Sequence, residues 1–247
     1  METQIIKINK ENLDSIEMDE AGKLIAAGEL VAFPTETVYG LGGDALDPEA
    51  AHKIYAAKGR PSDNPLIVHI AEYEDMYRVG RNIPPQAKLL ADAFWPGPLT
   101  MIVEKSDNVP YATTGGMDTV AVRMPNHPVA LALIRKSGCL IAAPSANTSG
   151  RPSPSKASHV AEDLSGKIAM IIDGGEVSIG IESTIIDLTE KTPMVLRPGY
   201  ITPKMLSDVL GEEVIIDPGI IAADDTRKPK APGMKYKHYA PKADMII

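Results

Sequence analysis

Short apolar runs rich in β-branched residues alternate along the chain with stretches of helical periodicity. The apolar runs predict strands at 29–33, 66–70, 99–103, 119–123, around Ile141, and at 168–172, 184–188, 194–197 and 214–216. The periodic stretches predict helices at 19–27, 47–57, 128–136, 155–163 and 202–210. Strands and helices that alternate in this way are typical of an α/β domain.

Residues that commonly start and stop helices support these limits. Asp47 and Pro48 are N-cap and first-turn residues, and Thr202 followed by proline opens the last helix. Gly28 and Gly211 stand where the first and last helices should end.

The pattern weakens near Asp217. Residues 218–247 carry proline, glycine and several basic residues, with little periodicity before the final apolar residues 245–247. We therefore predict a catalytic domain over 1–217, and over 218–247 a linker or lid segment that leads toward a C-terminal domain absent from this chain.

Composition limits the class of protein. The chain has 247 residues, of which 44% are hydrophobic, which suffices for one large domain. The single cysteine, Cys139, lies in an apolar run and is interpreted as a core thiol. No histidine pair has metal-ligand spacing, so no protein-bound metal is predicted. Without a signal peptide or a membrane-length apolar run, the protein is predicted to be cytoplasmic.

The formal net charge of −8 argues against a general nucleic-acid coat, because binding to phosphate backbones depends on basic surface. Acidic residues gather between Glu11 and Glu20, whereas basic residues recur beside glycine and proline loops. Basic loops in an acidic protein suit a compact anionic ligand, although ordinary scattered surface charge explains the same distribution equally well.

The first of three informative blocks is 33–44, directly after a predicted strand. It contains hydroxyls, a carboxylate and three glycines, which allow the backbone to approach a ligand closely. Residues 40–45 formally match a dinucleotide-binding fingerprint, but no helix is predicted to start there, which disfavours a nicotinamide or flavin site. The chain has no Walker A motif.

The second block, 58–69, holds Lys58 and Arg60 in a loop with glycine and proline. Two such cations can bind separate oxygens of a polyphosphate. Alternatively, they are cations at a helix C-terminus, where the helix dipole favours positive charge. This alternative explains Lys58 better than the rigid segment that follows.

The third block, 144–155, is rich in hydroxyl, amide and guanidinium donors and again follows a predicted strand. We expect the three blocks to meet beyond the carboxyl ends of strands. A plain flexible loop remains an alternative for the third block. Residues 153–156 and 62–64 resemble acyl-serine motifs, but their order is reversed and the third motif is missing.

Together the blocks resemble the YrdC domain family, and in particular the two-domain threonylcarbamoyl-AMP synthases. The resemblance covers about residues 15–215 and continues through the linker at 231–241. The motifs that carry it are 34–41, 58–61, 95–100, 122–125, 144–147, 183–187 and 196–199.

The resemblance implies a twisted, open, mixed β-sheet flanked by helices, with a concave basic face for the active site. It implies a nucleotidyltransferase that uses ATP with Mg²⁺, L-threonine and bicarbonate, and makes L-threonylcarbamoyladenylate and pyrophosphate. The product would pass to a downstream tRNA threonylcarbamoyl transferase. Direct tRNA binding stays open.

The family's functional residues transfer onto matching positions of this chain. L-Threonine would be bound by Thr37, His69, Arg123, the Ala143 backbone and Ser183. ATP would be bound by Lys58, Arg60, Asn64, Thr119, Ser145, Asn147, Ser153, Arg197 and Tyr239, with Lys58 and Arg60 as the catalytic phosphate clamp and Tyr239 in a lid.

Two alternatives remain. The chain could be a double-stranded RNA-binding YrdC module without catalysis, whose affinity would fall steeply with salt and ignore threonine. It could also be a related YrdC domain that handles another carbamoyl-adenylate, although the threonine-pocket residues and the linker disfavour this. The sequence offers no firm candidate for a general base.

Overall fold

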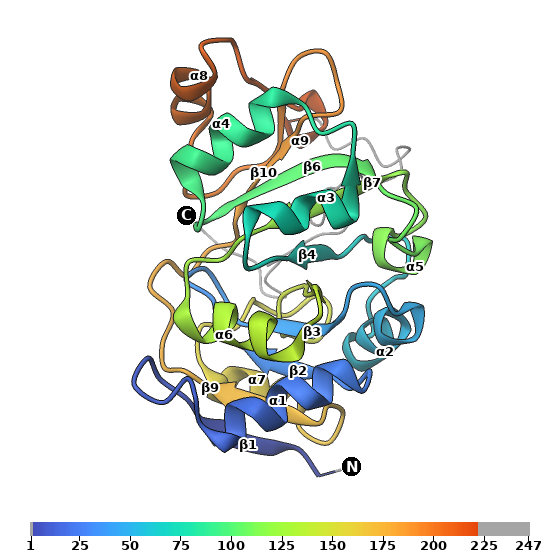
Figure 1. Cartoon of the computed structure of the whole chain (residues 1–247), viewed down its shortest axis with the longest axis vertical. Coiled ribbons are helices and arrows are strands. Elements are labelled where there is room, and N and C mark those ends of the chain that lie inside the picture. The colour runs from blue at the N-terminus through green and yellow to red at the C-terminus, as the bar shows by residue number, and fades with distance from the viewer. Residues whose placement is uncertain (1, 222–247) are drawn as a thin grey trace, which may run out of the picture.

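A computed structural model describes residues 2–221 of the chain. Within this range the strands form one mixed sheet of 12 strands, in the order β1-β9-β2-β3-β8-β4-β7-β6-β10-β11-β12, with β5 paired to the outer part of β6 (Figure 1). The strands are β1 (Gln4–Lys7), β2 (Val31–Phe33), β3 (Gly40–Asp44), β4 (Ile67–His69), β5 (Gly80–Arg81), β6 (Leu99–Lys105), β7 (Thr119–Arg123), β8 (Ile141–Ala142), β9 (Met170–Asp173), β10 (Thr184–Asp187), β11 (Met194–Arg197) and β12 (Ile215–Ile216).

The helices are α1 (Ile16–Ala26), α2 (Pro48–Lys58), α3 (Met76–Val79), α4 (Pro85–Phe94), α5 (Tyr111–Thr114), α6 (Pro128–Ser137), α7 (Ala157–Leu164), α8 (Pro203–Leu210) and α9 (Pro218–Ile221), with a short 3₁₀ turn at Tyr73–Asp75. The sheet combines parallel pairs such as β4–β7 with antiparallel pairs such as β6–β7. The predicted fold class, an open mixed sheet flanked by helices, is confirmed.

Capping residues determine where the helices begin. The Ser15 hydroxyl accepts a hydrogen bond from the Met18 amide at 3.3 Å, so α1 starts at Ile16, three residues before the predicted start. Asp47 caps α2 in the same way at the Glu49 amide, and Gly59 ends α2 in the left-handed conformation with φ 60°.

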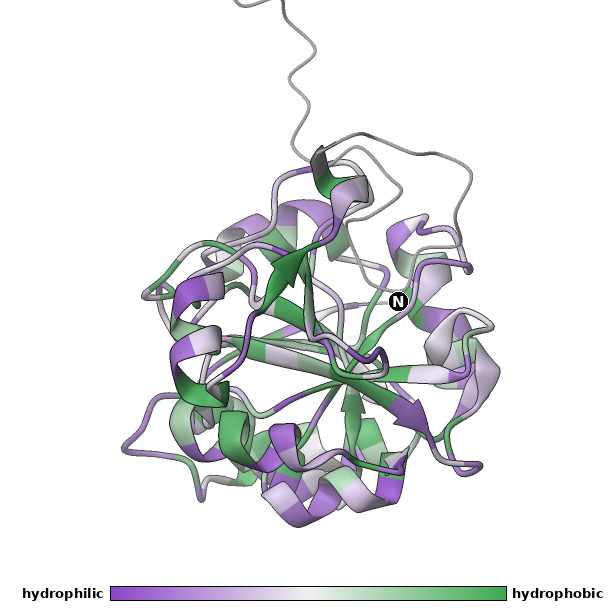
Figure 2. Cartoon of the chain, turned by 90° about the horizontal axis from the view of Figure 1, so that it is seen from above, coloured by the Kyte–Doolittle hydropathy of each residue, from purple (hydrophilic) through white to green (hydrophobic). Residues whose placement is uncertain are grey.

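Helices α1 and α6 pack together against β2, β8 and β9 in the lower half of Figure 1. Gly22 makes this contact possible, because a Cβ there would lie 2.9 Å from the backbone carbonyl carbon of Lys136. A second, larger apolar cluster packs α2, α4, α7 and α8 onto the sheet. Figure 2 shows the result, with apolar strands inside and hydrophilic helix faces turned outward.

The structure contains elements that the hydrophobic pattern did not predict, among them β1, β3 and α4. Residues 40–44, within the first block, form β3 between β2 and β8. A Cβ at Gly42 would lie 2.9 Å from the Phe33 ring and 2.8 Å from Ile141. These glycines therefore allow close packing between neighbouring strands.

The end of the described range continues the same sheet. β12 pairs in parallel with β11, and α8 packs against α4. Residues 218–221, at the start of the predicted linker, form the helical turn α9. Tyr239 and the rest of the predicted lid lie outside the described residues. Among the described helices, none is long and apolar enough to cross a membrane.

Candidate active site

One pocket on the sheet brings together all five residues predicted to bind L-threonine. Its walls come from the β2–β3 loop, the end of β4, the end of β7, the segment after β8 and the start of β10. The lining residues are Thr35, Thr37, Val38, Gly40, Ile67, His69, Arg123, Ala143, Pro144, Glu182, Ser183 and Arg197. Segments far apart in sequence thus meet in one site.

Strand register explains why these residues share a face. β4 and β7 run parallel, with Ile67 beside Ala121 and His69 beside Arg123. Because alternate residues of a strand point to the same side, these four side chains project from one face of the sheet. Ile67 and Ala121 also belong to a small buried cluster with Ile102, Ile185 and Leu196, and Ile67 from this cluster gives the pocket an apolar floor.

Arg123 is held in place by three partners. Its Nη1 donates to the Thr37 hydroxyl at 2.9 Å, its Nε donates to the Gly97 carbonyl at 3.3 Å, and its Nη2 lies 2.7 Å from Glu36 Oε1. The contact with Glu36 is an ion pair without hydrogen-bond alignment, and both side chains are less than a tenth exposed. The guanidinium is thus oriented by the protein and still has N–H groups for a ligand.

His69 is buried and uncharged in this site. Its Nδ1 lies 3.2 Å from the Ile67 carbonyl, and the Ile141 backbone also contacts the ring. Burial, assisted by the positive charge of Arg123, lowers the pKa of His69 to about 3. The imidazole therefore stays uncharged at physiological pH. Its ring meets Phe33 edge-on.

Ser183 and Arg197 form the opposite wall. Arg197 Nε donates to the Ser183 carbonyl, and Nη2 donates to the Ser183 hydroxyl, each at 3.1 Å. The same hydroxyl lies 2.7 Å from that of Thr100. Burial lowers the pKa of Arg197 to about 10, which leaves it charged at neutral pH. Two arginines therefore face the pocket.

Lys58 does not lie where a side chain that contacts phosphate directly would be expected. Only 1% of this residue is exposed, and its Nζ donates to the carbonyl of Ser145 at 2.5 Å and to that of Asn147. Burial lowers its pKa well below the usual value. In this structure the lysine ties the end of α2 to the loop 145–147 and so shapes that loop.

Arg60, Asn64 and Thr119 lie together at the other end of the same sheet face. Arg60 donates to the Asn64 and Pro65 carbonyls at 3.2 and 3.0 Å. Asn64 Oδ1 and Thr119 Oγ1 are buried and have no hydrogen-bond partner among the described residues. Thr119 is four residues before Arg123 on β7, roughly 13 Å along the strand. A ligand that contacts both Thr119 and Arg123 must therefore be long.

The loop after β8 lies between these two ends. Ser145 donates to the Asn147 side-chain oxygen at 2.5 Å, and the Asn147 amide donates to the Thr148 and Arg151 carbonyls. Asp163 on α7 accepts from the Thr148 amide at 2.8 Å and pairs with Arg151. The loop is therefore held from both α2 and α7.

The expectation that all three blocks lie at carboxyl ends of strands is wrong for the second block. Residues 58–65 precede β4 and lie at its amino end. They still meet the third block, because β8 runs antiparallel to β4 and its carboxyl end lies beside the start of β4.

Sequence reasoning missed three acidic residues around the site. Glu36 pairs with Arg123, Asp163 anchors the loop 147–151, and Glu182 lines the pocket and accepts from Ser153 at 2.7 Å. Glu36 stands inside the first block, but the sequence alone assigns its carboxylate no role. Glu182 directly precedes a motif residue, Ser183, but no pattern in the neighbouring sequence indicates that Glu182 itself belongs to the site.

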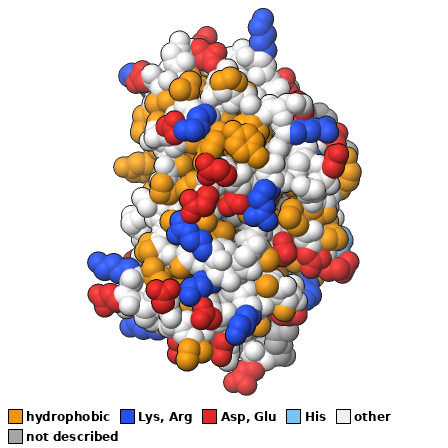
Figure 3. Space-filling view, in the orientation of Figure 1, with side chains coloured by type: hydrophobic (Ala, Val, Ile, Leu, Met, Phe, Trp, Pro, Cys, Tyr) orange, Lys and Arg blue, Asp and Glu red, His pale blue; other side chains and the backbone are white. Residues whose placement is uncertain are grey.

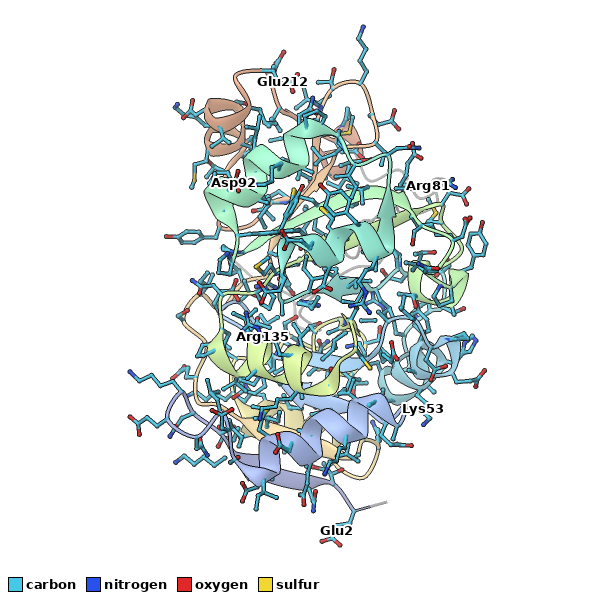
Figure 4. The ribbon with its side chains drawn as sticks, in the orientation of Figure 1. Glu2, Lys53, Arg81, Asp92, Arg135 and Glu212 are labelled. Carbon is cyan, nitrogen blue, oxygen red and sulfur yellow. The ribbon has the colours of Figure 1, made fainter. Side chains whose placement is uncertain are left out.

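Two larger grooves lie elsewhere on the molecule. One of about 540 Å³ is lined by Glu2, Gln4, Leu24, Glu29 and Ala169, and one of about 300 Å³ lies beside Lys53 and Lys167. Neither gathers buried polar groups as the first pocket does. The charged residues labelled in Figure 4, such as Arg81, Arg135 and Glu212, likewise lie on outer elements.

Comparison with known proteins agrees with this geometry. Residues 23–199 match the family model Sua5_yciO_yrdC, described as telomere recombination, and residues 201–247 match the model for the C-terminal domain of threonylcarbamoyl-AMP synthase. Threonylcarbamoyl-AMP synthase of Pyrococcus abyssi is 54% identical over 246 residues, which are 99% of this chain and 71% of that protein. The chain belongs to the threonylcarbamoyl-AMP synthase family.

Further relatives of known name or structure are similar to this chain over most of its length. The enzyme of Bacillus subtilis is 53% identical over 92% of this chain and 65% of its own length. The structure of P. abyssi Sua5 in complex with L-threonine superposes with a TM-score of 0.91 at 52% identity, over 99% of this chain and 70% of that one. Escherichia coli YciO, with a TM-score of 0.72 and 23% identity, shares the fold over 83% of this chain and 99% of its own.

Membership in the threonylcarbamoyl-AMP synthase family confirms the enzyme class predicted from sequence, an ATP-using nucleotidyltransferase. The prediction that the C-terminal domain is missing is wrong, because residues 201–247 match that domain's model. The hydrophobic pattern could not reveal this boundary near residue 200, since β12 extends the sheet and α8 packs on α4.

Proposed function

We propose that this chain forms L-threonylcarbamoyladenylate and pyrophosphate from L-threonine, bicarbonate and ATP. The observation that carries the proposal is the single pocket that collects Thr37, His69, Arg123, Ala143 and Ser183 from five segments of the chain. Family membership supports it, as does the L-threonine complex of the P. abyssi relative. The product would serve threonylcarbamoyladenosine modification of tRNA through a downstream transferase.

In this proposal Arg123 binds the carboxylate of L-threonine, because it presents oriented donors in a buried setting. Ser183 and Thr37 add hydroxyl groups on either side. His69, buried and uncharged in the pocket wall, would form a hydrogen bond with the substrate hydroxyl. Serine, which lacks the methyl group, would make fewer contacts with the apolar floor.

ATP would extend along the same sheet face toward Asn64 and Thr119, whose unpartnered buried oxygens can accept hydrogen bonds from the nucleotide. Arg60, Ser145, Asn147, Ser153 and Arg197 would surround its phosphates. Lys58 would hold the phosphate-binding loop in shape.

Mg²⁺ would enter with the nucleotide. The described residues contain no group of three histidine, cysteine, aspartate or glutamate side chains placed to hold a metal. This fits a metal held mainly by nucleotide phosphates and water, as is usual for Mg²⁺. When bound, the ion would neutralise charge on the phosphates.

The reaction requires positioning and charge stabilisation more than a protein nucleophile. The threonine nitrogen, as the neutral amine, forms a bond to the bicarbonate carbon. The hydroxyl of that carbon then leaves as water with one of the N–H protons, which gives a carbamate. A carbamate oxygen then attacks the α-phosphorus of ATP, the bond to the β-phosphate oxygen breaks, and pyrophosphate leaves. Arg60 and Arg197 would stabilise charge that develops during this transfer.

The test is pyrophosphate release from ATP and bicarbonate, with L-threonine or L-serine. We expect release that depends on L-threonine and is weak with L-serine. Arg123→Met should lose this dependence, whereas Arg81→Met, on the exposed strand β5, should not. Release that ignores the amino acid would contradict the proposal.

The RNA-binding alternative receives less support. On the face drawn in Figure 3, acidic and basic side chains are interspersed, so this face lacks the continuous basic surface that double-stranded RNA needs. The buried arginines of the pocket would suit a small anionic ligand better than a polymer backbone.

A further inference from the structure

Glu182 is a carboxylate in a pocket whose other charged lining residues are arginines. It comes directly before Ser183 at the start of β10 and is half-buried. Of the described residues that line the pocket, it is the acidic one, beside Arg123 and Arg197. Glu36 also pairs with Arg123, but it does not line the pocket.

The chain position of Glu182 and its contact with Ser153 place it between the two predicted subsites. It directly precedes Ser183, which belongs to the threonine side. Ser153, on the ATP side, donates to Glu182 Oε1 at 2.7 Å. Among residues 2–221, Ser153 is the hydrogen-bond donor found on this carboxylate, so its second oxygen can accept from a ligand.

A carboxylate next to bound phosphates would raise the energy of the complex unless a cation lies between them. L-Threonine carries such a cation, its ammonium group, at the atom that must meet bicarbonate and ATP. With its carboxylate on Arg123 and its hydroxyl on His69, the amino group is the remaining polar group of the substrate. Glu182 is the anionic partner that the pocket offers it.

We propose that Glu182 binds the amino group of L-threonine, and so selects α-amino acids over hydroxy acids and points the nitrogen toward bicarbonate. This inference rests on the proposed function, because it deepens the substrate recognition at that pocket. It assigns the recognition of the substrate's positive charge to a residue outside the predicted set.

The test compares binding of L-threonine with binding of the dihydroxy acid in which a hydroxyl replaces the amino group. Wild-type protein should prefer L-threonine strongly in calorimetric titrations. Glu182→Gln should bind L-threonine about 10- to 100-fold more weakly, because it loses a charge-assisted hydrogen bond. Its affinity for the dihydroxy acid should change little.

A matched control separates this role from a structural one. Glu104→Gln removes an exposed carboxylate far from the pocket, paired with Arg81, and should leave both affinities unchanged. Urea unfolding of each variant checks that the fold is intact.

The outcomes are distinct. If wild-type protein neither binds L-threonine nor releases pyrophosphate with it, the proposed function fails. If wild-type protein does both and Glu182→Gln keeps the same preference over the dihydroxy acid, only the role of Glu182 is overturned. A raised requirement for Mg²⁺ in Glu182→Gln, with that preference unchanged, would overturn it in favour of metal binding.

Discussion

The buried pair of Glu36 and Arg123 gives the clearest stability prediction. The side chains are 7% and 5% exposed, and Glu36 Oε1 lies 2.7 Å from Arg123 Nη2. At the effective dielectric constant of protein sites, two charges about 4 Å apart attract by about 4 kcal/mol. Glu36→Gln keeps the shape and removes the charge, so Arg123 keeps only the Thr37 hydroxyl and the Gly97 carbonyl as partners.

Removing one partner of a buried ion pair usually costs about 3–5 kcal/mol, because the other charge stays buried. We expect a loss near the lower limit, about 3 kcal/mol in the free energy of unfolding, because glutamine still offers a carbonyl oxygen. A typical domain is stable by about 5–15 kcal/mol, so the variant should remain folded.

Urea unfolding followed by circular dichroism measures this loss, with an unchanged dependence on urea concentration as the check for a common unfolded state. Glu104→Gln is the matched control, since Glu104 pairs with Arg81 at 3.4 Å on the surface and should cost less than about 1 kcal/mol. In an Arg123→Met background, Glu36→Gln should cost much less. Equal costs in both backgrounds, or a cost no larger than the control's, would refute the reasoning.

Further substitutions test other parts of the structure. His69 has a pKa of about 3 in the folded state and about 6.5 when unfolded, so its neutral burial should cost stability as the pH falls below about 6.5, by up to about 1.4 kcal/mol per pH unit. His69→Gln should therefore lose less stability than wild type between about pH 7 and 5. If the unfolding free energies of the two proteins fell in parallel with pH, this reasoning would be wrong. Gly22→Val should lower the unfolding free energy by about 1–3 kcal/mol because its side chain meets the Lys136 backbone, whereas Ala26→Val on the exposed side of α1 should not. Lys58→Met should leave two loop carbonyls unpaired and so weaken ATP binding, which calorimetric titration measures. An unchanged affinity for ATP would show that Lys58 does not contribute to the ATP site.

Strands with clear patterns could be predicted with their bounds, while others could not. β7 and β11 occur where their short apolar runs predict them, and α8 occupies its predicted place because Thr202 caps its start and Gly211 its end. β3 was missed because glycine has low strand propensity, and its glycines are required by packing that only the fold reveals. β1 was missed because most of its residues are exposed at the sheet edge.

The threonine-binding residues could be proposed from the resemblance, and the structure places all five around one pocket. The partners that orient them could not be predicted. Glu182 and Ser153 are 29 residues apart in sequence, and their contact depends on how β10 and the loop after β8 meet. The burial of Lys58 against loop carbonyls likewise depends on tertiary packing that spacing in the sequence does not encode.

The most direct test of the central claim is identification of the product by mass spectrometry after incubation with ATP, Mg²⁺, L-threonine and isotopically labelled bicarbonate. The account predicts an adenylate that contains both threonine and the labelled carbon, formed by wild-type protein and lost in Arg123→Met. An adenylate without the label, or the same labelled product from Arg123→Met, would contradict it.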